Sequence, residues 1–210
     1  MTEQEFFGLI NSRESIVSII GIDITSIPLA VKLAENGFKV KLFSWEGGTI
    51  VFPGSDEMFA GPIGTQLNYF VSTGIVTLTT SKKNAQQAHI FIVCEPPQPH
   101  IPNYDFIDKT DNFLRNLSTM GKLVIFHLPG NPDFVKTYTL PGLENIKPDI
   151  YWNVGVDFYL SAIEGKIFKP GGQIDYMPLM SLKGMTNSCY RITENLYNQI
   201  GINLLKPVRN

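Results

Sequence analysis

Residues 19–43 read IIGIDITSIPLAVKLAENGFKVKLF, and this stretch carries the strongest structural signal in the chain. Its first residues belong to an apolar run from Ser15 to Gly21, which is typical of a strand buried on both faces. Residues 25–36 place apolar side chains at helical spacing, and Gly37 follows where a helix commonly ends in a left-handed conformation. Residues 38–43 form a second strand-like run. The stretch therefore predicts a strand, a helix and a parallel second strand joined by a right-handed crossover.

Apolar runs continue to alternate with helical patterns along the rest of the chain. The expected strands are 75–79, 89–94, 122–126, 157–162, 177–182 and 203–208, and the expected helices include 103–119 and 187–200. Such alternation favours a mostly parallel sheet with helices on both faces. We therefore predict a doubly wound α/β fold of about eight strands in one domain over residues 15–210. An N-terminal helical extension, residues 1–14, precedes it and contains a short amphipathic helix at 2–12.

The composition excludes several classes of partner. The 210 residues carry a net charge of −2 without any run of Lys or Arg, so we expect neither nucleic acid nor a membrane surface as a partner. The N-terminal residues are polar, and no apolar stretch reaches the length of a membrane span, so we expect a cytoplasmic protein. The two cysteines, Cys94 and Cys189, belong to no metal-ligand or redox spacing and are interpreted as small buried hydrophobic side chains.

Several separated segments resemble, in the same order, the UDP-glucose/GDP-mannose dehydrogenase family, the nucleotide-sugar 6-dehydrogenases. Residues 19–43 resemble the family's opening IGLGYVGLPLAVALAEKGFKVIGFD, and AQQAHIFIVCEPPQP (85–99) resembles its ADVIIICVPTP. GKLVIFHLPGNPDFVKTYTLPGLE (121–144) is similar to GQLVVLESTVPPGTTEEVVLPILE, and VGVDFYLSAIEGKIFKPGG (154–172) to VGEDFYLAYSPERVDPG. SLKGMTNSCYRITENLYNQI (181–200) resembles the end of the family's N-terminal domain. The resemblance spans roughly residues 15–208 and implies a Rossmann-like NAD-binding domain.

The resemblance places a cofactor site at the first turn, where Gly21, Ile22, Asp23 and Ile24 stand. Gly21 keeps the family's first glycine, whereas Asp23 replaces the glycine that lets the backbone approach the pyrophosphate, and Ser26 replaces the third. One like-charge contact between a carboxylate and a phosphate costs about 4 kcal/mol at ~4 Å and an effective dielectric of 20. This cost lowers the affinity for the cofactor roughly a thousandfold. It exceeds the ~0.3–1 kcal/mol by which a helix N-terminus attracts an anion at an exposed site.

Other positions of the implied crevice are altered in the same direction. Ser44 stands where the family has the acidic residue that binds the adenosine ribose. Pro97 and Pro129 replace two threonines and therefore offer neither a hydroxyl nor an amide proton. The family's glutamate falls on Gly165, and a shift of one residue would restore it as Glu164. We therefore expect no bound cofactor, although the resembling family binds NAD.

Some remaining polar and aromatic residues have two interpretations. Glu95 and His127 are expected at the carboxyl edge of the sheet, where they form either an acid–base pair or, as we favour, two solvated loop residues. The chain's three histidines show no ligand spacing, so no metal site is expected. Aromatic residues of the segment after the second strand are expected to pack into the core rather than form a binding surface: Phe52, Phe59, Tyr69 and Phe70.

No catalytic residue is assigned. The family's catalytic cysteine, its lysine and its dimerisation helix lie beyond the end of this chain, and Cys189 matches no catalytic position. We predict a non-catalytic relative of the family's NAD-binding domain, a pseudoenzyme that acts by binding or assembly. The alternatives are a dehydrogenase subunit whose catalytic domain lies on another chain, and a binder of a different small ligand. Self-association, or binding to a full-length relative, would cover apolar residues near the end of the chain unless these finish the core: Leu196, Tyr197, Ile200, Leu204 and Leu205.

Overall fold

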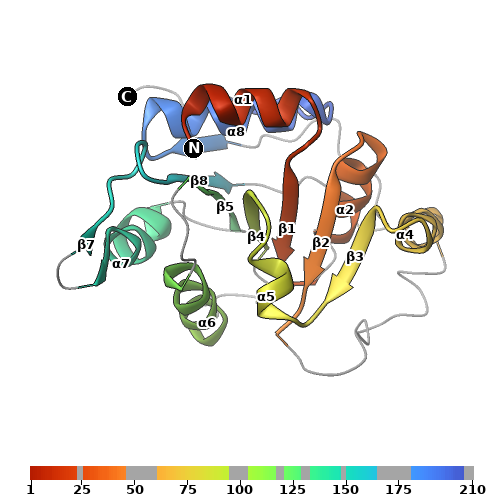
Figure 1. Cartoon of the computed structure of the whole chain (residues 1–210), viewed down its shortest axis with the longest axis horizontal. Coiled ribbons are helices and arrows are strands. Elements are labelled where there is room, and N and C mark those ends of the chain that lie inside the picture. Colours follow the sequence, from red (N-terminus) through yellow and green to blue (C-terminus); the bar gives the residue numbers. More distant parts are fainter. Residues whose placement is uncertain are drawn as a thin grey trace.

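A computed structural model describes residues 1–22, 26–45, 61–94, 104–116, 121–128, 133–147, 150–164 and 181–205. Within these ranges, seven strands form one sheet in the order β3-β2-β1-β4-β5-β8-β9 (Figure 1). The strands are β1 (Ile16–Ile20), β2 (Lys39–Phe43), β3 (Val76–Thr79), β4 (Ile90–Cys94), β5 (Leu123–Leu128), β8 (Tyr159–Glu164) and β9 (Ser181–Gly184). All neighbours pair in parallel except β8 and β9. The predicted doubly wound α/β fold is confirmed, with seven strands in the described sheet instead of about eight.

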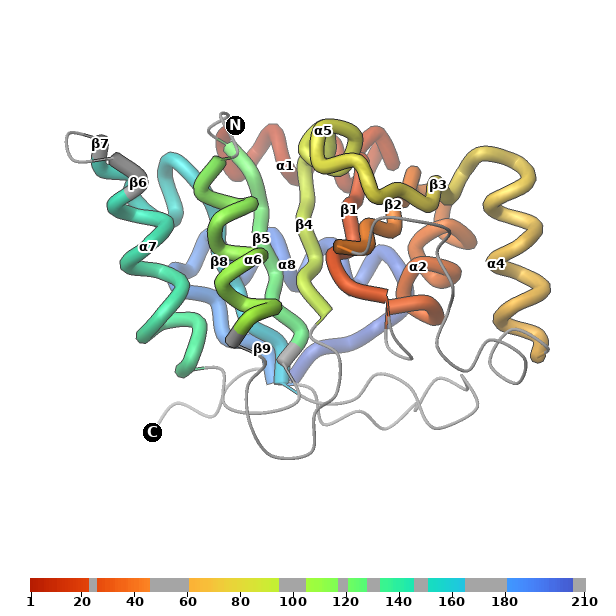
Figure 2. The backbone as a smooth tube through the Cα atoms, turned by 90° about the horizontal axis from the view of Figure 1, so that it is seen from below, coloured from red at the N-terminus to blue at the C-terminus, as the bar shows by residue number. Residues whose placement is uncertain are grey.

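Helices cover both faces of this sheet. One face carries α1 (Glu3–Asn11), α2 (Ser26–Glu35), α4 (Pro62–Ser72) and α8 (Asn187–Gln199). The other carries α5 (Lys82–Ala85), α6 (Tyr104–Arg115), the π-helix η1 (Val135–Thr139) and α7 (Leu140–Glu144), which leads into a small antiparallel pair, β6 (Asn145–Lys147) and β7 (Ile150–Tyr151). Figure 1 shows α1 and α8 on one side of the strands and α6 and α7 on the other. Figure 2, turned by 90°, separates α4 and α7 at opposite ends of the sheet.

The predicted strand–helix–strand unit is confirmed at β1, α2 and β2. The parallel strands pair from Ile16 with Lys39 to Ile20 with Phe43, and the helix between them buries Leu29 and Leu33 completely. Gly37 has φ +87°, the left-handed conformation expected after the helix. The order 3-2-1-4-5 places the reversal of strand order between β1 and β4, where ligands bind in open α/β sheets.

The N-terminal helix is tied into the same core. A capping box begins α1, since Glu5 N–H donates to the Thr2 hydroxyl at 3.3 Å and Thr2 N–H donates to the Glu5 carboxylate at 2.6 Å. Phe6 and Ile10 are fully buried, and the Phe6 ring meets Tyr159 of β8 edge to face at 5.3 Å. On the exposed side of the two helices, the Arg191 guanidinium of α8 donates two hydrogen bonds to the Glu3 carboxylate.

Arg13 holds the end of α1 against two other helices. Its φ is +64°, the one positive value of a non-glycine residue in the described part of the chain. The guanidinium donates to the carbonyl oxygen of Asn36 at 2.9 Å and to the side-chain oxygen of Gln199, and it lies 4.9 Å from the centre of the Phe38 ring. One side chain thereby joins the C-terminal ends of α1, α2 and α8.

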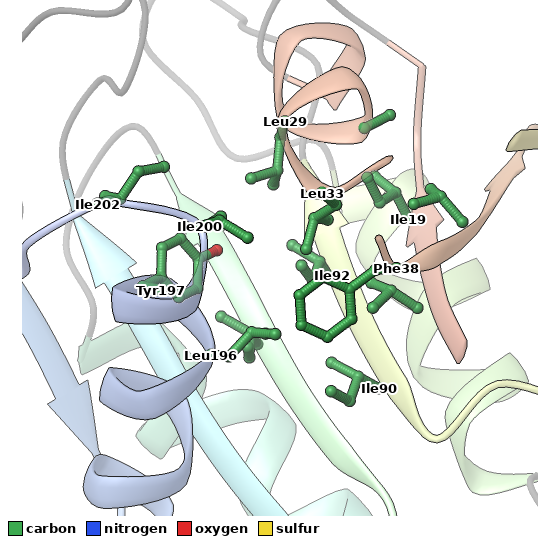
Figure 3. Close-up of a cluster of buried hydrophobic side chains, with 14 of the residues drawn as sticks. Ile19, Leu29, Leu33, Phe38, Ile90, Ile92, Leu196, Tyr197, Ile200 and Ile202 are labelled. Carbon is green, nitrogen blue, oxygen red and sulfur yellow. The ribbon is translucent and has the colours of Figure 1, made fainter. Parts of the chain in front are cut away.

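The apolar residues of the last helix finish the core. Figure 3 shows Leu196, Tyr197 and Ile200 turned toward side chains of β1, β4 and α2. These three are fully buried and Leu204 is 8% exposed, whereas Leu205 is 46% exposed. Of the two interpretations of these residues, the structure therefore supports the one in which they finish the core, apart from Leu205.

Three expected strands differ from the observed ones. The strand expected at 177–182 is β9, Ser181–Gly184, and residues 177–180 lie outside the described residues. The strand expected at 157–162 begins at Tyr159, because Asp157 accepts from the backbone N–H of Asn153 at 2.8 Å and closes a turn around Gly155. The strand expected at 203–208 is reduced, within the described residues, to a single bridge between Leu205 and Ser181. The expected helix 187–200 is confirmed as α8.

Candidate functional site

Gly21 forms the tight turn at the carboxyl end of β1. Its φ is +93°, and its N–H donates to the carbonyl oxygen of Phe43 at 3.1 Å. A Cβ at this position would collide with the carbonyl oxygen of Cys94 and stand 3.2 Å from Cζ of Phe106. Only glycine fits, because both the backbone conformation and the neighbouring strand exclude a side chain. This geometry agrees with the tight turn that is expected at Gly21.

The residues after Gly21 lead into α2. Ile22 is partly buried against the core, and Ser26 is completely buried at the first position of the helix. Asp23 and Ile24 lie outside the described residues, as do Glu95, Pro97 and Pro129. The place of these five residues in the crevice therefore stays a prediction from their residue types.

Ser44 stands directly after β2, as expected, and its N–H donates to the carbonyl oxygen of Thr79 at 3.1 Å. A serine hydroxyl carries no charge and has a single oxygen, so it cannot bind two ribose hydroxyls with two oxygens as a carboxylate does. The following residue, Trp45, packs its indole edge to face against Phe43 at 4.8 Å and against Phe113 at 5.7 Å. Lys82 Nζ lies 5.5 Å from the centre of the same indole.

Aromatic side chains of α6 fill the space beside the carboxyl ends of β1 and β2. Phe113 stacks on Phe43 at 5.6 Å and meets Phe91 of β4 at 6.0 Å. Phe106, on the first turn of the same helix, is 7% exposed and lies against the backbone of Gly21. The sequence predicts a helix over residues 103–119 but does not predict that its rings meet Trp45, since such contacts join segments about seventy residues apart.

A buried polar pair lies at the carboxyl end of β5. Nε2 of His127 is hydrogen-bonded to the Tyr197 hydroxyl of α8, and the sheet register places Cys94 of β4 beside His127. Burial lowers the pKa of His127 to about 3, so the imidazole is neutral, and burial also raises the pKa of Tyr197 well above its usual value. Nδ1 of His127 is buried and has no hydrogen-bond partner among the described residues. The expectation that His127 is a solvated loop residue is wrong, because its strand extends one residue beyond it and α8 covers its side chain.

The other residues singled out from the sequence have structural or exposed positions. Glu164 ends β8, is exposed, and accepts from the Ser181 hydroxyl at 3.4 Å. Cys189 is completely buried, with its sulfur 3.3 Å from the N–H of Leu160, which confirms its interpretation as a core residue. Cys94 is 1% exposed. Of the aromatic residues after β2, Tyr69 is 61% exposed, contrary to the expected burial, and Phe70 packs partly against the core, whereas Phe52 and Phe59 lie outside the described residues.

The described residues contain neither a cluster of metal ligands nor a transmembrane helix. No three His, Cys, Asp or Glu side chains gather there in a way that could hold a metal ion. No helix in the same ranges combines the length and the apolar character of a transmembrane span.

Known proteins resemble this chain in structure. No protein-family model and no curated protein matches its sequence. Among solved structures, UDP-D-ManNAc dehydrogenase from Pyrococcus horikoshii superposes with a TM-score of 0.71 and 17% identity over 91% of this chain and 46% of its own. GDP-mannose dehydrogenase from Pseudomonas aeruginosa gives 0.73 and 16% over 91% and 46%. An NDP-N-acetyl-D-galactosaminuronic acid dehydrogenase from Methanosarcina mazei gives 0.73 and 15% over 98% and 46%. The chain thus spans about half the length of these dehydrogenases, and the resemblance seen in its sequence is confirmed at the level of the fold.

Proposed function

We propose that this chain is a non-catalytic relative of the NAD-binding domain of nucleotide-sugar dehydrogenases, and that it acts by binding or assembly instead of by NAD-dependent oxidation. The fold that it shares with those enzymes supports the relationship. The proposal that the cofactor is no longer bound depends on the residues that occupy the crevice at the reversal of strand order.

The observation that carries the proposal is the packing of α6 across the carboxyl ends of β1 and β2. Phe106 lies against Gly21, and Phe113 stacks on Phe43 and contacts Trp45. In a dinucleotide-binding domain, the ligand enters the crevice at the carboxyl ends of these strands, with its pyrophosphate at the turn that Gly21 begins. Rings packed at van der Waals distance here leave the adenosine half of a dinucleotide without its usual space, because interiors of this kind are close-packed.

The charges at two crevice positions also argue against NAD binding. Asp23 brings a carboxylate to the turn that would face the pyrophosphate, and Ser44 removes the carboxylate that would face the ribose. Both replacements weaken NAD binding, the first by repulsion and the second by loss of charge-assisted hydrogen bonds.

The thiols support the absence of dehydrogenase chemistry on this chain. It has two cysteines, and both are buried, at 1% and 0% exposure for Cys94 and Cys189. A cysteine nucleophile has to reach its substrate as a thiolate, which a buried apolar environment disfavours.

A second candidate function, the binding of a different small ligand, is favoured by the indole of Trp45. Its Nε1 is buried and has no hydrogen-bond partner among the described residues. Buried polar groups of this kind normally have a partner in the functional state of a protein. A ligand rich in hydrogen-bond acceptors would supply one, and it would need no pyrophosphate.

The decisive experiment is titration calorimetry of the purified chain with NAD and with NADH. We expect no heat of binding at physiological cofactor concentrations, and no NADH absorbance when a UDP-sugar and NAD are added together. A micromolar dissociation constant, equivalent to about −8 kcal/mol, would contradict the proposal and favour a dehydrogenase subunit that is completed by another chain.

A further inference from the structure

The two edges of the sheet differ in what lies against them. At the β9 edge, Leu205 forms a bridge with Ser181, and the N–H of Leu182 donates to the carbonyl oxygen of Leu205 at 3.4 Å. At the opposite edge, β3 pairs with β2 and with no other strand of the described ranges. Figure 1 shows β3 as the outermost strand, with α4 beside it. The described sheet therefore ends at β3 without a further backbone partner.

The outward backbone groups of β3 belong to Val76 and Leu78. The carbonyl oxygens of Ile75 and Thr79 accept hydrogen bonds from N–H groups of β2 and of the residue after it, with N···O distances of 2.9 and 3.1 Å. Backbone groups alternate in direction along a strand, so every second residue of β3 faces β2, and Val76 and Leu78 face away from it. Their two N–H and two C=O groups have no hydrogen-bond partner in the part of the chain that the structure describes.

The β3 edge lacks the features with which proteins usually protect an open strand. Such edges commonly carry charged side chains, proline or a β-bulge, which prevent pairing with another chain. Residues 72–81 contain no charged residue and no proline, and the register of β3 with β2 is continuous from Val76 to Thr79. Thr77, in the middle of the strand, is exposed. The side chains of this edge therefore do not oppose its pairing with a further strand.

We propose that the β3 edge is an interface at which two copies of this chain pair their β3 strands in antiparallel orientation, about a twofold axis at Thr77. This axis brings Val76 opposite Leu78 of the second copy, and Leu78 opposite Val76. Each of these pairs exchanges two N–H···O bonds, so all the outward groups of both copies are satisfied. Thr77 meets its own symmetry mate in a close, non-hydrogen-bonded pair, a position in which two threonines interact favourably.

The chemistry of this edge fits a second copy of the chain. Its two outward residues are placed evenly about Thr77, so a single twofold rotation matches every donor to an acceptor. The nearest cations, Lys82 and Lys83, follow β3, and the antiparallel order brings them toward the uncharged residues 72–75 of the other copy. The two seven-stranded sheets thereby join into one continuous sheet. This inference rests on the assembly that the proposed function includes, and it names the surface and the partner.

Thr77→Cys tests the position of the axis. In the proposed pair, the two Cα atoms at this position lie about 4.5 Å apart, within the roughly 4.4–6.8 Å that a disulfide spans. We expect a disulfide-linked dimer on a non-reducing gel after oxidation by air with copper–phenanthroline. Thr73→Cys is the matched control, because Thr73 is also exposed but its symmetry mates would stand about 20 Å or more apart. The native chain is a second control, since Cys94 and Cys189 are both buried.

Charges at the same position give a reversible test. Thr77→Lys places two like charges opposite each other at the axis, so it should raise the dimer dissociation constant about fivefold in sedimentation equilibrium. An equimolar mixture with Thr77→Glu should restore association, because the mixed dimer places opposite charges at the axis. Thr73→Lys should leave the dissociation constant unchanged. Circular dichroism of each variant separates loss of pairing from loss of the fold.

The outcomes separate this inference from the proposed function. Crosslinking of Thr77→Cys that is no faster than that of Thr73→Cys, or native-like association of Thr77→Lys, would overturn the pairing of β3. If the native chain is a dimer in spite of such a result, assembly uses another surface and the proposed function is unaffected. A native chain that is monomeric at every concentration would overturn both the pairing and self-assembly. It would not bear on the loss of NAD binding, which calorimetry measures separately.

Discussion

The carbonyl oxygen of Cys94 stands where a side chain on Gly21 would have to lie. The ends of β4 and β1 meet at this point, and the left-handed φ of Gly21 turns the chain toward α2 immediately afterwards. The closeness of two backbones, and not a bound ligand, is therefore sufficient to require glycine here.

Gly21→Ala should destabilise the domain by about 3 kcal/mol, since it adds overlap with the Cys94 backbone to the roughly 1–2 kcal/mol of a left-handed alanine. Gly37→Ala is the matched control, because Gly37 has a similar φ of +87° but its Cβ would stand 3.6 Å from the flexible Arg13 side chain. It should cost only about 1–2 kcal/mol. Urea unfolding of both variants measures the difference. Equal losses would mean that the approach of β4 is not what requires glycine.

Restoring the family's cofactor residues should restore part of NAD binding. Asp23→Gly removes a carboxylate and Ser44→Asp returns one, so the double variant should gain measurable affinity in titration calorimetry. Adding Phe106→Ala should increase it further, because the ring beside Gly21 is removed. Phe6→Ala serves as the control for loss of a buried ring far from the crevice. If the triple variant keeps its circular dichroism and binds no NAD, other residues close the crevice.

Arg13 should affect the stability of the domain more through its contacts than through its left-handed backbone conformation. Arg13→Ala loses the bonds to Asn36 and Gln199 and the contact with Phe38, and about 2–3 kcal/mol of stability is expected to go with them. Arg13→Gly loses the same contacts but relieves the positive φ, so it should be about 1 kcal/mol more stable than the alanine variant. Thermal unfolding of the two variants compares them directly. An alanine variant as stable as the glycine variant would contradict the left-handed conformation.

The buried imidazole predicts sensitivity to acid. His127 has a folded pKa of about 3 against an ordinary value of 6.5, so its contribution to stability is complete above pH 6.5 and is lost as the pH falls toward 3. The loss is about 1.4 kcal/mol for each pH unit inside that window. His127→Gln should flatten this dependence in urea unfolding between pH 7 and 4.5, while costing stability at neutral pH because the bond to Tyr197 changes. A variant with an unchanged pH profile would refute the assignment.

Association stays a prediction, and the surface available for it differs from the one expected from the sequence. The exposed large apolar side chains among the described residues include Tyr138, Tyr151 and Val156, and not Leu196 or Tyr197. We expect light scattering on the purified chain to give a mass above that of the monomer, or a relative to co-purify from its own cells. A monomer mass at high concentration with no co-purifying partner would contradict assembly.

The sequence predicted the parts of the fold that local patterns specify. The strand–helix–strand unit, the stop at Gly37 and the helix at 187–199 all depend on periodicity and turn chemistry within short segments. The start of β8 was missed by two residues, because the turn closed by Asp157 competes with an apolar run that looks continuous. Periodicity alone does not show which residues a turn will take from a strand.

The contents of the crevice were less predictable. His127 was read as solvated because nothing near it in sequence indicates that Tyr197, seventy residues later, covers it. The packing of Trp45 on Phe113 likewise depends on a contact between distant segments.

The pairing of α1 with α8 has a consequence for biosynthesis. Glu3 binds Arg191 and the side chain of Asn11 accepts from Gln199, so α1 has its principal partner in α8, a helix that the ribosome makes much later. Phe6 and Ile10, which are buried in the folded domain, remain exposed to solvent or bound to a chaperone until nearly all of the described chain has emerged from the ribosome. The packing of α1 into the core is thus delayed until α8 has emerged, and contacts of such long sequence separation form slowly.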